Sequence, residues 1–213
     1  MLHDVLLAAH IAGGTVALLA LGPAIVLSRG SGLRVGPGHR RAGRVYVWAM
    51  VVALASAYPL AALLPSAFLG GVALFTTFLV ASGWRWIRRG SADTVGLGRG
   101  LAVGMLIAGV GMVIVGVRQL GAGDGLGVAL LVFAGIGGVL ALEDLRALWS
   151  GRPARPQRVA LHLGRMLGGA IATLTAVLVV NVETEPVWLG WIAPAVLIVP
   201  MIAWRTARVL RAA

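Results

Sequence analysis

Residues 126–149 read LGVALLVFAGIGGVLALEDLRALW. Residues 126–142 carry no charge, and two carboxylates and an arginine follow only near the end of the stretch. A helix needs about 20 mostly apolar residues to cross the hydrocarbon core of a bilayer. The stretch therefore predicts a membrane-spanning helix with ionisable groups close to one membrane surface.

The rest of the 213-residue chain has the same character. Hydrophobic residues make up 59% of it and charged residues 12%, whereas soluble domains are about half apolar and a quarter charged. The stretches that qualify as spans are 4–28, 45–64, 67–87, 101–118, 126–149, 158–182 and 188–207. We predict an all-α bundle of about seven transmembrane helices that forms a single transmembrane domain over residues 1–213.

The charged residues predict how the bundle is oriented. Eighteen arginines and seven acidic residues give a net charge of +11. In a soluble chain this charge would suggest nucleic acid as a partner, but sixteen of the arginines lie after the first, third and fifth spans or in the C-terminal tail. Such segments stay in the cytoplasm. We therefore predict that the N-terminus lies outside and the C-terminus in the cytoplasm. The predicted location is the bacterial inner membrane. The expected partner is the lipid bilayer, and nucleic acid is not expected to bind.

Two residue types are absent. Without cysteine the chain has no disulfide, thiolate metal site or cysteine nucleophile. Without lysine it has no Schiff base, which excludes a retinal protein despite the number of helices.

Small residues and tryptophans predict packing and depth. Small residues that would let helix backbones approach closely are Gly100 and Gly104 in the fourth span, Gly164 and Gly168 in the sixth, and Ala9, Gly13 and Gly14 in the first. Five tryptophans fall at predicted inner ends, as an aromatic belt requires. They are Trp48, Trp84, Trp86, Trp149 and Trp204.

Ionisable residues of the fifth and sixth spans are predicted at one depth. His162 and Arg165 are three residues apart and share a helix face. An unpaired arginine at the bilayer centre costs about 2.5–3.5 kcal/mol, so Arg165 either extends to the surface or has a partner. Glu143 and Asp144 are adjacent, so we expect only one to face the sixth span. Asp144 is favoured, because Glu143 has a local partner in Arg146.

The second span carries further polar residues that are predicted at the same depth as those of the fifth and sixth spans. If its helix begins near Pro37, then His39, Gly43 and Tyr46 lie on one face, with Arg40 and Arg44 on another. Cations at a helix N-terminus oppose the macrodipole. Membrane orientation is one explanation for them, and the other is an anion held there, such as a lipid phosphate or an acidic metabolite.

These residues define three overlapping candidate sites. The cofactor-binding candidates are His39, His162, His10 and Tyr46. The metal-binding candidates are His39, His162, Asp144 and Glu143. The anion-binding candidates are Arg40, Arg44 and Arg165. Two histidines with a carboxylate ligate a divalent metal, two histidines alone ligate a haem, and histidine with arginine holds a quinone or a phosphate. Against all three stands the interpretation that these groups only pair helices.

Three segments carry a resemblance: HIAGG (10–14), HRRAGRVYVWAM (39–50) and HLGRMLGGAIATLTAVLVVN (162–181). Together they resemble an uncharacterised family of predicted bacterial multi-pass membrane proteins, a domain of unknown function with HI-G, HR-G-Y and H-RM elements. The resemblance marks His10, His39, Arg40, Gly43, Arg44, Tyr46, His162, Arg165 and Met166. It implies a membrane bundle with a shared set of polar residues and no particular reaction.

Three functions stay open, and the sequence does not decide whether the protein is an enzyme. The favoured one is a cytoplasmic-side site of histidine, arginine and carboxylate that binds a redox cofactor, which is a haem, a metal or a quinone. The second is a transporter or lipid-binding protein for an anionic lipid or small molecule. The third is a structural or assembly subunit, in a homo-oligomer or a larger membrane complex.

Overall fold

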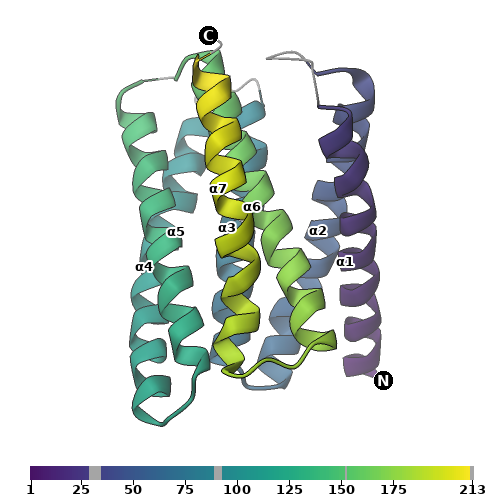
Figure 1. Cartoon of the computed structure of the whole chain (residues 1–213), viewed down its shortest axis with the longest axis vertical. Coiled ribbons are helices and arrows are strands. Elements are labelled where there is room, and N and C mark those ends of the chain that lie inside the picture. Colours follow the sequence, from purple (N-terminus) through teal and green to yellow (C-terminus); the bar gives the residue numbers. More distant parts are fainter. Residues whose placement is uncertain (29–34, 89–92, 152, 212–213) are drawn as a thin grey trace.

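The computed structural model describes residues 1–28, 35–88, 93–151 and 153–211. These residues form seven helices that run alternately up and down through one bundle (Figure 1). The helices are α1 (Leu2–Val26), α2 (Pro37–Leu63), α3 (Ala67–Ile87), α4 (Asp93–Gly121), α5 (Leu126–Trp149), α6 (Arg155–Asn181) and α7 (Val187–Arg211). Each contains a stretch long and apolar enough to cross a membrane. The predicted all-α membrane bundle is confirmed.

Several helices extend beyond the predicted spans. Helix α2 begins at Pro37 and α4 covers 93–121, whereas the spans began at 45 and covered 101–118. Hydropathy marks only the apolar part of a helix, and the backbone hydrogen bonds continue through the polar turns at its ends. Pro37 favours the early start, because its missing N–H would have no partner in the first turn anyway.

The basic segments gather at one end of the bundle. Helices α1, α3, α5 and α7 finish there and α2, α4 and α6 begin there, at the top of Figure 1. We call this the arginine-rich end. Arg29, Arg34, Arg89 and Arg152 lie outside the described residues. That this end faces the cytoplasm stays a prediction.

Apolar side chains cover the outside of the bundle. Val180 is 83% exposed and Leu197 is 77% exposed, whereas Asp144 and Arg165 inside the bundle are 1% and 2% exposed. This distribution suits lipid, which solvates apolar side chains and leaves polar groups to pair within the protein.

Helix α3 lies at the centre and contacts α2, α4, α5 and α6. Its apolar stretch is 56% buried, against 17% for α1 and for α7. Phe75 of α3 stacks on Phe133 of α5 with ring centroids 5.4 Å apart. Helices α2 and α6 do not pack backbone to backbone, because no Cα atom of one lies within 8 Å of the other. Side chains alone bridge them.

Most of the glycines at which helix backbones approach closely are not the ones that the sequence predicts. Gly13 is confirmed, because a Cβ there would lie 2.8 Å from the backbone nitrogen of Ala53 in α2. Four of the predicted glycines are not contact positions, since a Cβ on any of them would meet nothing within 4 Å: Gly14, Gly100, Gly104 and Gly164. Helix α4 instead meets α5 at Gly116, where a Cβ would lie 3.1 Å from the carbonyl oxygen of Gly127. The prediction for α4 was wrong because spacing alone does not say which face meets a neighbour.

Candidate functional site

Two histidines near the arginine-rich end are fixed in the same way. His39 Nδ1, on the first turn of α2, lies 2.8 Å from the carbonyl oxygen of Ala24 in α1. His162 Nδ1, on α6, lies 2.8 Å from the carbonyl oxygen of Gly83 in α3. In both, Nδ1 meets a backbone carbonyl of a neighbouring helix. We call His39 and His162 the histidine pair.

The hydrogen bonds of the histidine pair determine which nitrogen carries the proton. A carbonyl oxygen only accepts hydrogen bonds, so each Nδ1 is the donor. In a neutral imidazole the Nε2 atom then has a free lone pair. Histidines that bind metals are oriented in this way, with the second nitrogen donating to a carbonyl or carboxylate. Each ring is thus fixed and its Nε2 is chemically able to be a ligand.

Tyr46 lies deeper in the bundle, two turns along α2 from His39. It is 2% exposed, and its hydroxyl has no hydrogen-bond partner among the described residues. The hydroxyl fits against Gly169 of α6, where a Cβ would lie 3.0 Å from it. The nearby Thr173 hydroxyl donates to its own helix, at Gly169, and lies 3.4 Å from the sulfur of Met50. Tyr46 is therefore buried with a hydroxyl that makes no hydrogen bond to the described residues, and Thr173 is the polar side chain beside it.

A second group of polar residues joins α3, α5 and α6 beside the histidine pair. Arg165 Nη2 lies 2.8 Å from an oxygen of Asp144, 2.8 Å from an oxygen of Glu143 and 3.0 Å from the carbonyl oxygen of Leu140. Asp144 also accepts hydrogen bonds from the Ser82 hydroxyl and from Trp86 Nε1, the latter at 3.1 Å. Helix α3 thus holds the Asp144 carboxylate of α5 against Arg165 of α6.

Arg85 of α3 completes this ion network. Its Nη2 lies 3.8 Å from Asp144, and its guanidinium lies 3.9 Å from the ring centroid of Trp86. A Cβ on Gly98 of α4 would lie 2.6 Å from the guanidinium carbon, so the group packs directly on the α4 backbone. The Arg85 side chain is 5% exposed, and its Nε and Nη2 make no hydrogen bond to the described residues. Two arginines and two carboxylates leave the ion network formally neutral.

An apolar cluster separates the ion network from the arginine-rich end. Trp86, Leu148 and Leu161 form it. Leu148 lies one turn beyond Asp144 on α5, and Leu161 one turn before Arg165 on α6. Of the two alternatives for Arg165, the structure has the partner: the side chain is buried in ion pairs and does not extend to the surface.

The structure divides the predicted constellation into two parts. The expected pairing of Asp144 with Arg165 is confirmed. The expectation that only one carboxylate faces α6 was wrong, because Glu143, 54% exposed, also reaches Arg165. No ion pair joins Glu143 to Arg146 among the described residues. Adjacent residues of a helix point about 100° apart, but both side chains can still reach a partner that lies between their two directions, as Arg165 does here.

The four-residue metal set does not come together. Both carboxylates are engaged by Arg165, and the described residues contain no group of three or more His, Asp or Glu side chains suited to a metal ion. His10 is also separate. Its Nδ1 lies 2.8 Å from the carbonyl oxygen of Ala53, and it sits 14 residues, or about 21 Å, along α1 from Ala24, the partner of His39.

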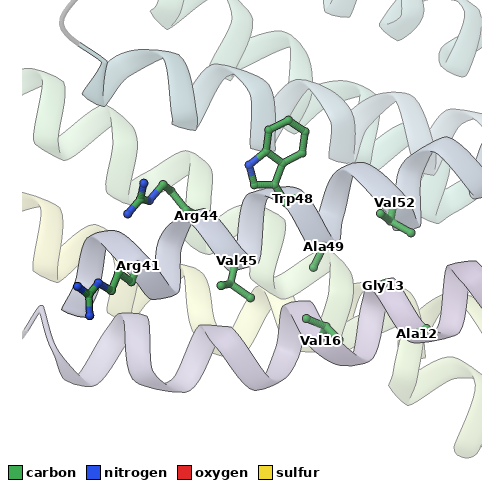
Figure 2. A pocket seen from close by; sticks show the side chains of 9 residues that line it. All are labelled: Ala12, Gly13, Val16, Arg41, Arg44, Val45, Trp48, Ala49 and Val52. Atoms are coloured by element: carbon green, nitrogen blue, oxygen red, sulfur yellow. The ribbon is translucent and has the colours of Figure 1, made fainter. Parts of the chain in front are cut away.

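The predicted arginine set is divided as well. Arg165 lies inside the bundle, whereas Arg40 and Arg44 are exposed on α2. The faces of α2 are as predicted, with Tyr46 turned inward and the arginines outward. Arg44 lines an open groove together with Arg41, one turn earlier on α2 (Figure 2). Arg41 is not among the anion-binding residues predicted from the sequence.

Three residues of the ion network were missed. Ser82, Arg85 and Trp86 are spaced i, i+3 and i+4, so they share one face of α3. Arg85 had been counted with the loop arginines, and Trp86 with the aromatic belt. Trp86 is 3% exposed and serves as a hydrogen-bond donor, unlike Trp48 and Trp149, which are 68% and 72% exposed.

Comparisons with known protein families, curated proteins and solved structures find no match to this chain. The family resemblance of the HIAGG, HRRAGRVYVWAM and HLGRMLGG segments stays a prediction.

Proposed function

We propose that this integral membrane protein binds a redox cofactor, a haem ligated by His39 and His162, near its arginine-rich end. The observation that carries the proposal is the histidine pair. Both imidazoles donate through Nδ1 to a backbone carbonyl of a neighbouring helix, at 2.8 Å in each case. Both therefore offer Nε2 as a ligand from a fixed ring.

The arrangement of the helices supports a ligand between α2 and α6. Their backbones are not in contact, although they carry the two histidines. His39 and His162 would hold a haem between these two helices, whose backbones are far enough apart to leave side chains alone between them. The Tyr46 hydroxyl, which is buried and makes no hydrogen bond to the described residues, lies farther along the same two helices.

Haem fits the donor set better than the other two cofactors. A structural divalent metal usually takes four protein ligands, and the described residues supply no group of three or more. A quinone carbonyl needs a hydrogen-bond donor, whereas the Nε2 of each histidine has no proton in the neutral tautomer that its Nδ1 bond selects. His39 and His162 would hold a haem through Nε2, and the haem would supply one-electron redox chemistry.

The ion network is a positioning device in this proposal. Arg165 lies three residues after His162 on α6, and Gly83, the partner of His162, lies between Ser82 and Arg85 on α3. The contacts of Asp144 with both helices therefore fix the register of α3 against α6. That register sets the position of the His162 ring.

The proposal is tested by absorption spectroscopy. The protein is purified in mild detergent from cells supplied with a haem precursor, and its visible spectrum is recorded oxidised and reduced. The purified protein is then titrated with haemin. We expect a Soret band that shifts on reduction, stoichiometric iron and saturable binding of one haemin per chain. His39→Ala and His162→Ala should each abolish or strongly weaken the Soret band, the bound iron and the binding of haemin.

His10→Ala is the matched control, because it removes an equivalent 2.8 Å hydrogen bond at the other end of α1. It should lower stability as much as His39→Ala and leave the spectrum unchanged. Haemin that binds equally to the wild type and both pair variants, or no haemin binding at all, would reject the proposal. A purely structural role for the histidine pair predicts equal loss of stability in all three variants and no colour.

A further inference from the structure

An open groove runs between α1 and α2 on the outside of the bundle. Figure 2 shows side chains of both helices along it. Arg41 and Arg44 lie at its end near the arginine-rich side, Trp48 follows one turn further along α2, and aliphatic residues form the rest. Val16 of α1 and Val45 and Val52 of α2 are 44%, 47% and 48% exposed in it. The groove thus changes from cationic through aromatic to apolar along its length.

The cationic end of the groove has no counter-charge in the protein. Neither Arg41 nor Arg44 has an ion pair or a side-chain hydrogen bond to the described residues, although both are exposed. Asp144 and Glu143, which lie toward this end on α5, are already paired with Arg165. An anion bound at this end of the groove would therefore meet two guanidiniums that no described carboxylate already pairs.

The length of the groove identifies the kind of anion. Arg41 and Val52 are 11 residues apart, or about 17 Å along the helix. Half of a hydrocarbon core of about 30 Å is about 15 Å. The groove therefore has the depth of one leaflet, and its order of cation, tryptophan and aliphatic wall matches the phosphate, interfacial region and acyl chain of a phospholipid.

We infer that the α1–α2 groove binds one anionic phospholipid of the leaflet at the arginine-rich end. Arg41 and Arg44 bind the headgroup phosphate through charge-assisted hydrogen bonds, and Trp48 marks the level of the interface. The acyl chain lies against Val16, Val45 and Val52. A second copy of this chain is disfavoured as the occupant, because in a two-fold contact the two guanidiniums would face the same cationic surface.

The test is native mass spectrometry of the detergent-purified protein with added phosphatidylglycerol or phosphatidylcholine. We expect one phosphatidylglycerol to bind in preference to phosphatidylcholine. The double variant Arg41→Gln/Arg44→Gln should weaken that binding roughly 30-fold, since each arginine near the surface contributes about a fivefold factor. Val16→Trp, which fills the groove without altering charge, should weaken both lipids.

The control is Arg208→Gln/Arg211→Gln, which removes the same charge from the last turn of α7 at the same end. It should leave phosphatidylglycerol binding unchanged. The variants alter exposed side chains, so the melting temperature without lipid verifies that each is folded. Equal binding of the two lipids, an unchanged preference in the double variant, or a dimer that the groove variants dissociate would overturn the inference.

Discussion

Asp144 of α5 and Arg165 of α6 form a buried ion pair with an oxygen-to-nitrogen distance of 2.8 Å and side chains 1% and 3% exposed. The carboxylate is held from its other side by Ser82 and Trp86 of α3. A buried ion pair contributes little net stability compared with apolar residues of the same shape, but breaking one leaves an uncompensated charge. The relative positions of α3, α5 and α6 therefore depend on the Asp144 carboxylate, which contacts side chains of both other helices.

Asp144→Asn should destabilise the protein strongly. The substitution preserves shape but leaves Arg85 and Arg165 with only Glu143 as a counter-charge inside the bundle. Removing one partner of a buried pair costs about 3–5 kcal/mol. We expect a large fall in the melting temperature of the detergent-solubilised protein, measured by fluorescence-detected size exclusion after heating.

Glu143→Gln is the matched control for that measurement. Its side chain is 54% exposed and contacts the same Arg165 nitrogen. An exposed ion pair contributes at most about 1 kcal/mol, so the variant should retain most of the stability. Equal losses for the two substitutions would show that Asp144 has no special place in the network.

Gly98→Ala should destabilise the contact between α3 and α4. The new methyl would lie 2.6 Å from the guanidinium carbon of Arg85, which cannot retreat easily because it packs on Trp86. Such overpacking costs about 1–3 kcal/mol. Gly100→Ala, two residues on, meets nothing within 4 Å, so it should be neutral or stabilising by up to about 1 kcal/mol. A melting temperature for Gly98→Ala equal to that of Gly100→Ala would contradict the packing of Arg85 on α4.

Gly13→Ala should loosen α1 from α2. The added Cβ would lie 2.8 Å from the nitrogen and 3.2 Å from the Cα of Ala53, so the backbones must separate. The same movement would lengthen the hydrogen bond from His10 to the Ala53 carbonyl. The adjacent Gly14→Ala faces open space and serves as the control. Limited proteolysis of the α1–α2 connection should be faster for Gly13→Ala, and unchanged rates would refute the close contact.

The seven helices and the Asp144–Arg165 pair were predictable from sequence, because both follow from local physics. Membrane spans must be apolar over a fixed length, and a charge at membrane depth needs a partner. With a short loop between α5 and α6, Asp144 and Arg165 were the groups at matching depth. The prediction needed no knowledge of how the other helices pack.

The rest of the site depends on which helix occupies the centre. Helix α3 supplies Ser82, Arg85 and Trp86 to Asp144, but the sequence gives no sign that α3 and not another span is surrounded by neighbours. Arg85 near a helix end looks like an orientation signal until α4 covers it at Gly98. The sequence does not show which face of a helix meets a neighbour. For this reason Gly100 was wrongly predicted as a contact position, and Arg41 was not predicted to line a groove.

Tyr46→Phe should not lower the stability of the cofactor-free protein, and should raise it if anything. The Tyr46 hydroxyl is buried with no hydrogen-bond partner among the described residues, and burying an unpaired polar group is unfavourable by about 1–3 kcal/mol. Tyr58→Phe is the control, because the Tyr58 hydroxyl lies 2.7 Å from that of Thr77 and its removal should cost about 1 kcal/mol. Melting temperatures of both variants decide the matter. A clear loss for Tyr46→Phe in the cofactor-free protein would mean that the hydroxyl has a partner, and loss of haemin binding without a loss of stability would assign that partner to the ligand.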